Sequence, residues 1–226
     1  MTFHIITLFP KAFDSYLGES ILKRAILDKK IKVRFYNPRD FTKDKHDRVD
    51  RKPYGGGPGM VIQAEPVIRA IEKACSEMPS AYRLVPKIIW LTPSGKQFTN
   101  ESGTKYSKSR DLIIICGRYE GIDARVKKAF KVEEVSVGPF VLTGGELPAM
   151  LLIDVIARQV EGVLGDFNSR EESRVASPEV YTRPEVFTYK GKKLRVPKIL
   201  LSGHRAKIDE WRAAHQGVRR QRARRE

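Results

Sequence analysis

Residues 111–123 read DLIIICGRYEGID. The first six of them are almost wholly apolar instead of alternating with polar residues, which indicates a strand that is buried on both faces. The glycine-bounded loop that follows predicts a turn at the carboxyl end of this strand. Four other segments share the apolar character, at residues 3–8, 31–36, 87–91 and 132–137. We therefore expect these strands to form one buried sheet.

Segments of helical length and pattern lie between the strands. They cover residues 20–29, 64–77, 100–107, 123–129 and 148–159. Strands and helices that take turns along a chain are typical of an α/β fold with a parallel sheet. The sequence shows no internal repeat, so we predict this α/β fold class for the larger part of the chain.

The character of the sequence changes after Gln159. We expect an α/β domain over residues 1–161, followed by a linker over residues 162–180, where the sequence is polar and has no clear period. Residues 181–226 are basic with short apolar patches, and residues 208–215 have a helical pattern. They predict a small basic helical domain, or a basic arm that becomes ordered on binding RNA.

The charge of the chain gives the first indication of a partner. Among 226 residues, 43 Lys and Arg stand against 27 Asp and Glu, a formal net charge of +16. The excess is concentrated in residues 190–226, which contain 13 Lys and Arg and 3 acidic residues. Lys and Arg that meet phosphates release condensed counterions, so this block favours nucleic acid. An acidic membrane surface and a solvated tail are the alternatives.

Other features of the composition indicate a cytoplasmic protein without a membrane partner. The apolar runs have the length of strands and fall short of the roughly 18 residues that a membrane helix needs. Residues 1–5 do not resemble the start of a secretory leader. Cys75 and Cys116 stand in separate apolar contexts, so we expect two reduced, buried thiols.

Three loops that contain glycine follow strands of the predicted sheet. They are residues 93–95 (PSG), 117–123 (GRYEGID) and 138–148 (GPFVLTGGELP). Ligands of open α/β sheets bind at the carboxyl ends of the strands, and glycine lets the backbone approach a ligand closely. None of these loops has the Walker A or the dinucleotide-binding pattern. One loop alone is weak evidence, because tight turns also use glycine, but three in series predict a single ligand cradle.

A fourth segment, residues 48–60, reads RVDRKPYGGGPGM. Basic residues beside an aromatic side chain suit single-stranded RNA, where bases stack and phosphates are paired. A flexible surface loop is the alternative. No metal site is predicted, because no Cys/His cluster has zinc spacing and the histidines are scattered at His4, His46, His204 and His215.

Together these segments resemble the bacterial tRNA (guanine-N1)-methyltransferase family, of the trefoil-knotted SPOUT class. The resemblance covers nearly the whole chain and rests on long, near-verbatim strings. They are ITLFP at residues 6–10, PYGGGPGM at 53–60, CGRYEGID at 116–123, VLTGGELPAM at 141–150, YTRP at 181–184 and LSGH at 201–204.

The resemblance implies that the three glycine-containing loops form a deep knot that binds S-adenosylmethionine in a bent shape. It also implies a homodimer in which each active site is shared between two chains. Use of Mg²⁺ is left open, because no carboxylate cluster marks a site for it. On the family pattern, the residues that border or line the cofactor are Pro93, Gly95, Gly117, Tyr119, Glu120, Gly121, Val137, Gly138, Phe140, Val141, Leu142, Gly144, Gly145 and Pro148.

The implied reaction is methylation of N1 of the guanosine at tRNA position 37, beside the anticodon. The N1 proton must leave before the lone pair attacks the methyl group, which calls for a carboxylate base, and negative charge then grows on O6. The family places an arginine late in the helix after the third loop, here Arg158, and a catalytic aspartate beyond it. Residues 169–173 read SREES, which puts Glu172 in the place of the aspartate. Glu171 and Asp166 are the alternatives.

Four residues are expected to contact tRNA. Asp50 and Tyr54 lie in the basic, glycine-rich segment, and Arg183 and His204 lie in the strings near the carboxyl terminus. For His204, capping of a turn is the alternative. Two competing functions stay open. One is methyl transfer by the same class of fold to another RNA site or to a ribose 2′-hydroxyl, and the other is an RNA-binding relic that holds the cofactor without turnover.

Overall fold

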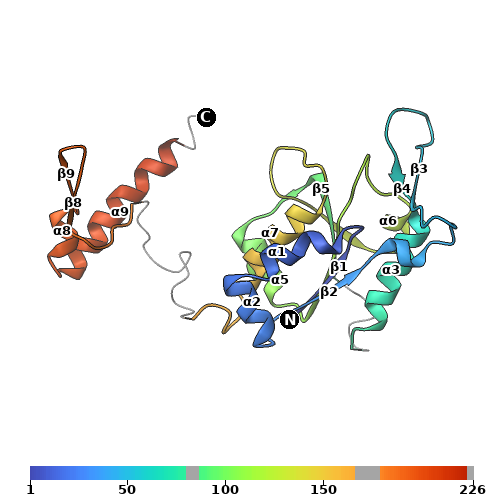
Figure 1. Ribbon diagram of the computed structural model, residues 1–226, viewed down its shortest axis with the longest axis horizontal. Helices are drawn as coiled ribbons and strands as arrows, with labels where there is room; N and C mark the ends of the chain where they lie inside the picture. The colour runs from blue at the N-terminus through green and yellow to red at the C-terminus, as the bar shows by residue number, and fades with distance from the viewer. Residues whose placement is uncertain (80–86, 166–178, 223–226) are drawn as a thin grey trace. The chain divides into compact units, whose positions relative to one another are not determined.

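The computed structural model describes residues 1–79, 87–165 and 179–222, and for residues 215–222 it describes the backbone alone. The chain divides into two compact units, Met1–Gly165 and Asp166–Glu226. Each unit is described by itself (Figure 1).

The first unit is built on a parallel sheet of five strands in the order β2-β1-β6-β5-β7. Every pair in this sheet is parallel, which confirms the α/β class with a parallel sheet. The almost wholly apolar sequence of β6 is explained by its place between β1 and β5. The strands are β1 (Thr2–Ile6), β2 (Lys32–Tyr36), β5 (Ile88–Gln97), β6 (Asp111–Ile115) and β7 (Val132–Ser136).

The strand β5 is longer than the sequence predicts. Its pairing with β7 shifts between Leu91 and Lys96, because both residues lie opposite Val135. Residues 92–95 therefore leave the ladder within one strand, where the sequence predicts a separate loop after the strand. Short β3 (Asp50–Arg51) and β4 (Val61–Ile62) pair antiparallel and enclose the glycine-rich segment.

Helices cover both faces of the sheet, and the buried side chains form two clusters that follow the alternation of the strands. Leu112 and Ile114 of β6 face the cluster that includes α7, whereas Ile113 and Ile115 face the cluster that includes α3. Figure 1 shows α3 and α7 on opposite sides of β1 and β2. The helices are η1 (Pro10–Phe13), α1 (Asp14–Leu17), α2 (Ser20–Leu27), η2 (Pro38–Phe41), α3 (Ala64–Ser76), α5 (Asn100–Ser107), α6 (Val126–Ala129) and α7 (Glu146–Ala157).

Helix α7 begins at Glu146, two residues before the predicted start at Pro148. Proline is tolerated in the first turn, where its missing N–H would have no partner within the helix. The extra residues matter for the site, because they place Glu146 in the first turn of the helix. Its side chain is buried there, beside Arg118 of the neighbouring loop.

The second unit contains a β-hairpin as well as helices, which differs from the purely helical domain that the sequence predicts. Strands β8 (Val186–Tyr189) and β9 (Lys192–Arg195) pair antiparallel, and α8 (Lys198–Leu201) and α9 (Arg205–Arg222) follow. The two residues of the turn, Lys190 and Gly191, both have positive φ, as tight hairpin turns require. In the part of the chain that the structure describes, no helix is long and apolar enough to cross a membrane.

Candidate functional site

Three segments that are distant in the sequence surround one cavity of about 300 Å³. They are the middle of β5 with its bulge, the loop after β6, and the end of β7 with the loop that follows it. The size of the cavity lies at the lower end of the range of small-molecule sites. The cavity is lined by Trp90, Leu91, Thr92, Pro93, Gly117, Arg118, Tyr119, Glu120, Gly121, Ile122, Val135, Ser136, Val137, Phe140, Val141, Leu142, Thr143, Gly144, Gly145 and Pro148.

Most residues that the family resemblance assigns to the cofactor line this cavity, and two do not. Gly95 lies against β7, where a Cβ would come within 2.5 Å of the backbone nitrogen of Val135. A Cβ on Gly138 would come within 2.2 Å of the ring of Phe140. These two glycines thus allow close packing behind the lining. The predicted residues in the lining are Pro93, Gly117, Tyr119, Glu120, Gly121, Val137, Phe140, Val141, Leu142, Gly144, Gly145 and Pro148.

The second and third loops are joined through their backbones. The amide of Gly145 donates to the carbonyl of Gly117 at 2.9 Å, and Arg118 forms a β-bridge with Gly144. A Cβ on Gly145 would lie 2.6 Å from the Cα of Cys116, so a larger residue would push the two loops apart. The glycine at this position is required by the approach of another backbone.

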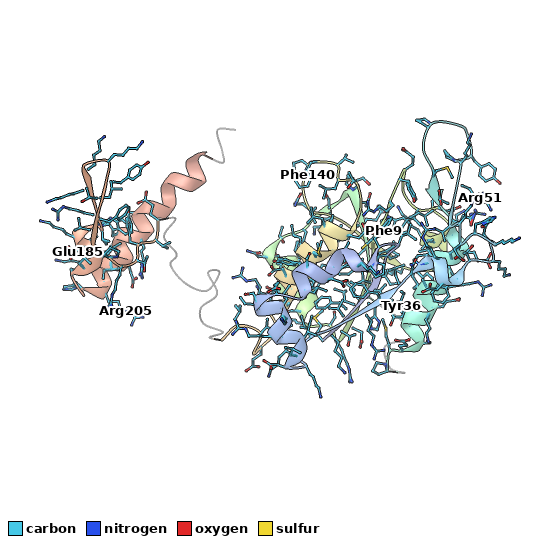
Figure 2. All side chains as sticks on the ribbon, viewed as in Figure 1. Phe9, Tyr36, Arg51, Phe140, Glu185 and Arg205 are labelled. Carbon is cyan, nitrogen blue, oxygen red and sulfur yellow. The ribbon has the colours of Figure 1, made fainter. Side chains whose placement is uncertain are left out.

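Apolar and aromatic side chains stand around the mouth of the cavity. Tyr119 is 51% exposed, Phe140 is 53% exposed and Val141 is 80% exposed. Figure 2 shows Phe140 at the edge of the first unit, on the loop between β7 and α7. Exposed apolar side chains beside a cavity are suited to cover the flat or apolar part of a ligand.

A buried ionic group lies behind the cavity, and our sequence reasoning did not assign it. Glu146 is 3% exposed, accepts a hydrogen bond from the hydroxyl of Thr7 at 2.8 Å and lies 2.9 Å from the Nε of Arg118. Burial and the Glu146 carboxylate raise the pKa of the Cys116 thiol, which favours its protonated form. The signal in the sequence was the single Arg118 inside the GRYEG string, between residues that were assigned to the cofactor.

A second, broader hollow of about 1540 Å³ adjoins the cavity, because Glu120 and Ile122 line both. Tyr54, which the sequence assigns to tRNA, is fully exposed and lines this hollow with Arg51 and Lys52. The amide of Glu120 donates to the carbonyl of Met60 at 3.0 Å and thereby ties the glycine-rich segment to the second loop. Asp50 in β3 is half-buried and is absent from the lining of the hollow.

Arg158 follows the last residue of α7 and is half-buried. It does not line the cavity. Its amide donates to the carbonyl of Asp154 at 3.1 Å, as in the last turn of a helix. The Asp154 carboxylate accepts a hydrogen bond from the hydroxyl of Tyr16, and this bond raises the pKa of Tyr16.

The remaining predicted residues are not placed beside the cavity. Glu172, the expected base, and its alternatives Glu171 and Asp166 lie outside the described residues. Arg183 and His204 are exposed in the second unit. The amide of His204 donates to the Ser202 hydroxyl at 3.2 Å, and its carbonyl accepts from Ile208 at the start of α9. Within residues 1–79, 87–165 and 179–222 no group of three His, Cys, Asp or Glu is arranged to hold a metal ion.

Comparisons with known proteins agree in the kind of protein that they find. A family model described as tRNA (Guanine-1)-methyltransferase TrmD matches residues 1–226. A tRNA (guanine-N(1)-)-methyltransferase of Ruminiclostridium cellulolyticum is 46% identical over 217 residues, which cover 94% of this chain and 89% of the relative. The protein of the same name from Clostridioides difficile is 44% identical over 216 residues, which cover 94% of this chain and 90% of the relative.

Proposed function

The chain belongs to the tRNA (guanine-N1)-methyltransferase family, and from this premise we propose that it methylates N1 of the guanosine at tRNA position 37 with S-adenosylmethionine as the methyl donor. The observation that carries the proposal is the convergence of the three loops on one cavity. These loops are the segments that the family resemblance assigns to the cofactor. We also propose that they form the trefoil knot of this class.

The cavity fits a cofactor with a flat nucleoside and a short flexible chain. Gly121, which lines the cavity, has no atom within 4 Å of its Cβ position, and Tyr119 and Phe140 offer exposed rings beside it. Bound S-adenosylmethionine would supply an activated sulfonium methyl group. The loops would hold it through backbone amides and carbonyls and exclude water from the reacting face. Mg²⁺ is not required by this proposal.

The proton at N1 of guanine has to be removed by a carboxylate, and we propose Glu172 for this role, with Glu171 and Asp166 as alternatives. A positioned base contributes about 10²–10⁴-fold to the rate. Arg158 is the proposed partner of O6, where negative charge grows. Its place at the end of α7 supports this role, because a packed helix fixes the backbone from which the guanidinium extends.

Recognition of tRNA is proposed to use both units. In the first unit, the hollow beside the cavity brings Arg51, Lys52 and the fully exposed ring of Tyr54 next to Glu120, with Asp50 close by in sequence. In the second unit, the basic strands and helices with Arg183 and His204 would contact phosphates without reading the sequence. The cytoplasm, where tRNA is modified, is the proposed location.

A homodimer with shared active sites is proposed as the active form. Helix α7 carries Leu147 and Leu151 at 59% and 42% exposure, and Tyr16 and Ile21 are also exposed on the neighbouring helices α1 and α2. Exposed apolar residues that gather on one face are typical of protein interfaces. A second copy of the chain would cover them.

The experiment that tests the proposed function is transfer of a labelled methyl group from S-adenosylmethionine to an unmodified tRNA transcript. Transcripts with guanosine or adenosine at position 37 are compared, and a reverse-transcription stop locates the product, since N1 methylation blocks the pairing edge. We expect label and a stop with guanosine alone. Label at another position would indicate a different RNA site and overturn the proposal.

The RNA-binding relic is the second candidate, because a glutamate stands where the family has an aspartate. Turnover of the unmodified chain tests it, and Glu172→Gln, compared with Glu171→Gln, tests the assignment of the base. We expect Glu172→Gln to lower turnover by about 10²-fold or more while cofactor binding is retained, and Glu171→Gln to change turnover by less than about threefold. Cofactor binding without any turnover in the unmodified chain would support the relic.

A further inference from the structure

The ionic contact between Arg118 and Glu146 joins the loop after β6 to the start of α7, at the end of the loop after β7, and both loops line the cavity. Arg118 lies in the loop after β6, and Glu146 is the first residue of α7, directly after the loop from β7. Arg118 Nε and Glu146 Oε2 are 2.9 Å apart but poorly aligned, so neither atom makes a hydrogen bond with a described residue. The contact is therefore an ion pair that depends on distance more than on direction.

Glu146 is fixed by the rest of the fold. Its side chain is 3% exposed, and Oε1 accepts from the hydroxyl of Thr7 just beyond the end of β1. The same Thr7 oxygen accepts from the amide of Phe9 at 3.0 Å, which orients it. A buried carboxylate that is held in this way needs a cation nearby, because an unpaired buried charge is costly. Arg118 is the cation that the structure provides.

The side chain of Arg118 lies against the backbone of the third loop on its way to this carboxylate. Its guanidinium covers Gly144, where a Cβ would lie 2.3 Å from Nε, and its Nη1 donates to the carbonyl of Thr143 at 3.3 Å. On its other side it lies 4.6 Å from the centre of the Phe9 ring. The side chain is 26% exposed and lines the cavity. It is thus held against the loop that a ligand in the cavity would touch.

We propose that Arg118, through its ion pair with Glu146, is a positioning residue that fixes the spacing of the second and third loops and so sets the affinity for the methyl donor. This inference rests on the proposed function, because it takes S-adenosylmethionine as the ligand of the cavity. It concerns binding of the cofactor and leaves the proton transfer at N1 to other residues.

The first test is Arg118→Met and Glu146→Gln, measured by calorimetric titration with S-adenosylmethionine and by steady-state kinetics with tRNA. We expect each variant to raise the Kd and the KM for S-adenosylmethionine roughly tenfold or more, with less than about twofold change in the KM for tRNA. Lys87→Met is the matched control, because the Lys87–Glu133 ion pair lies at the amino end of β5, away from the cavity. It should leave both constants unchanged.

The second test is the double variant Arg118→Met with Glu146→Gln. When both partners of an ion pair are removed, no unpaired charge stays buried, so the loss should be no larger than that of the worse single variant. Multiplicative losses would overturn the pairing. Equal rises in the KM for both substrates would show a general disturbance of the active site, and a lower Tm with an unchanged Kd for the cofactor would show a role in stability alone. Either result would overturn the proposal. Failure of the unmodified chain to bind S-adenosylmethionine would instead refute the proposed function.

Discussion

The two units of this chain use their residues in opposite ways. The first has a sheet with fully buried side chains on both faces, and its cavity is shaped by backbones in contact. In the second, none of the described residues 179–214 is buried, and strands and helices carry a dense set of Lys and Arg. We therefore expect function in the first unit to depend on steric fit, and function in the second to depend on charge.

The largest effect is expected from Gly145→Ala. Its Cβ would lie 2.6 Å from Cys116 Cα and 2.8 Å from the Gly117 nitrogen, so the backbone of the second loop has to move. A displacement of about 1 Å at a binding site lowers the rate by about 10²-fold. Overpacking lowers the free energy of unfolding by about 1–3 kcal/mol. Calorimetric titration with S-adenosylmethionine and the methyl-transfer assay measure the loss.

Gly165→Ala is the control for Gly145→Ala. It lies in the same unit, has no atom within 4 Å of its Cβ position and does not require positive φ. It should leave cofactor binding and turnover unchanged. Normal cofactor affinity in Gly145→Ala would show that the contact between the loops does not shape the site.

The next effect is on stability. Ile114 in β6 is fully buried in the sheet, and Ile114→Ala should lower the free energy of unfolding by about 2–5 kcal/mol. Phe187→Ala in the hairpin, where the ring is 54% exposed, should change it by less than about 0.5 kcal/mol.

The two tryptophans separate these stability effects in urea titrations. Trp90 lies in the first unit and Trp211 in the second, so their fluorescence reports on each unit when the other is replaced by phenylalanine. A loss above about 2 kcal/mol for Phe187→Ala would mean that its ring is buried in solution. The second unit would then have a packed core, and the difference in burial between the two units would not hold.

Much of the first unit could be predicted because its signals are local. The apolar strands and the glycine-containing loops are visible in short stretches, and the cavity lies where three of these loops meet. The contacts of Glu146 with Thr7 and Arg118 could not be found in this way. Thr7 and Glu146, for example, are 139 positions apart in the sequence. The bulge in β5 was likewise missed, because it shows only in the pairing with β7, although Pro93 and Gly95 are residue types that strands accept at bulges.

The second unit was predicted less well, because charge masks structural pattern. The first strand of the hairpin reads VFTY, which has high strand propensity, but the second reads KKLR, in which lysine has little, and the hairpin was missed. The signal available in the sequence was the Lys-Gly pair after VFTY, since glycine after a polar residue favours a turn with positive φ, which both turn residues have. The basic composition of this unit predicts nucleic acid as its partner, and this stays a prediction.

A smaller effect, on affinity, is expected from Lys192→Gln and Lys193→Gln in β9. Both side chains are exposed in a strongly basic segment. Each change should weaken tRNA binding about threefold at moderate salt and reduce the slope of log affinity against log salt by about 1, while turnover at saturating tRNA stays the same. Filter binding over a salt series measures both quantities.

Lys108→Gln, an exposed lysine of the first unit, is the control for this pair of changes. It should leave the salt slope as it is. If Lys192→Gln lowers turnover at saturating tRNA and leaves the affinity for tRNA unchanged, the second unit takes part in the reaction itself. The distinction between steric fit in the first unit and charge in the second would then no longer hold.

The smallest effect is expected from Gly191→Ala in the hairpin turn. Gly191 has φ +75° and no atom within 4 Å of its Cβ position, so the change adds backbone strain without a steric clash. Strain of this kind costs about 1 kcal/mol, which corresponds to roughly fivefold faster exchange of the amides that the hairpin protects. Amide hydrogen exchange of β8 and β9 measures it, and methyl transfer should stay within about twofold. Because Gly145→Ala adds the same methyl group to the first unit, an equal loss of turnover in both variants would refute the distinction between steric fit and charge.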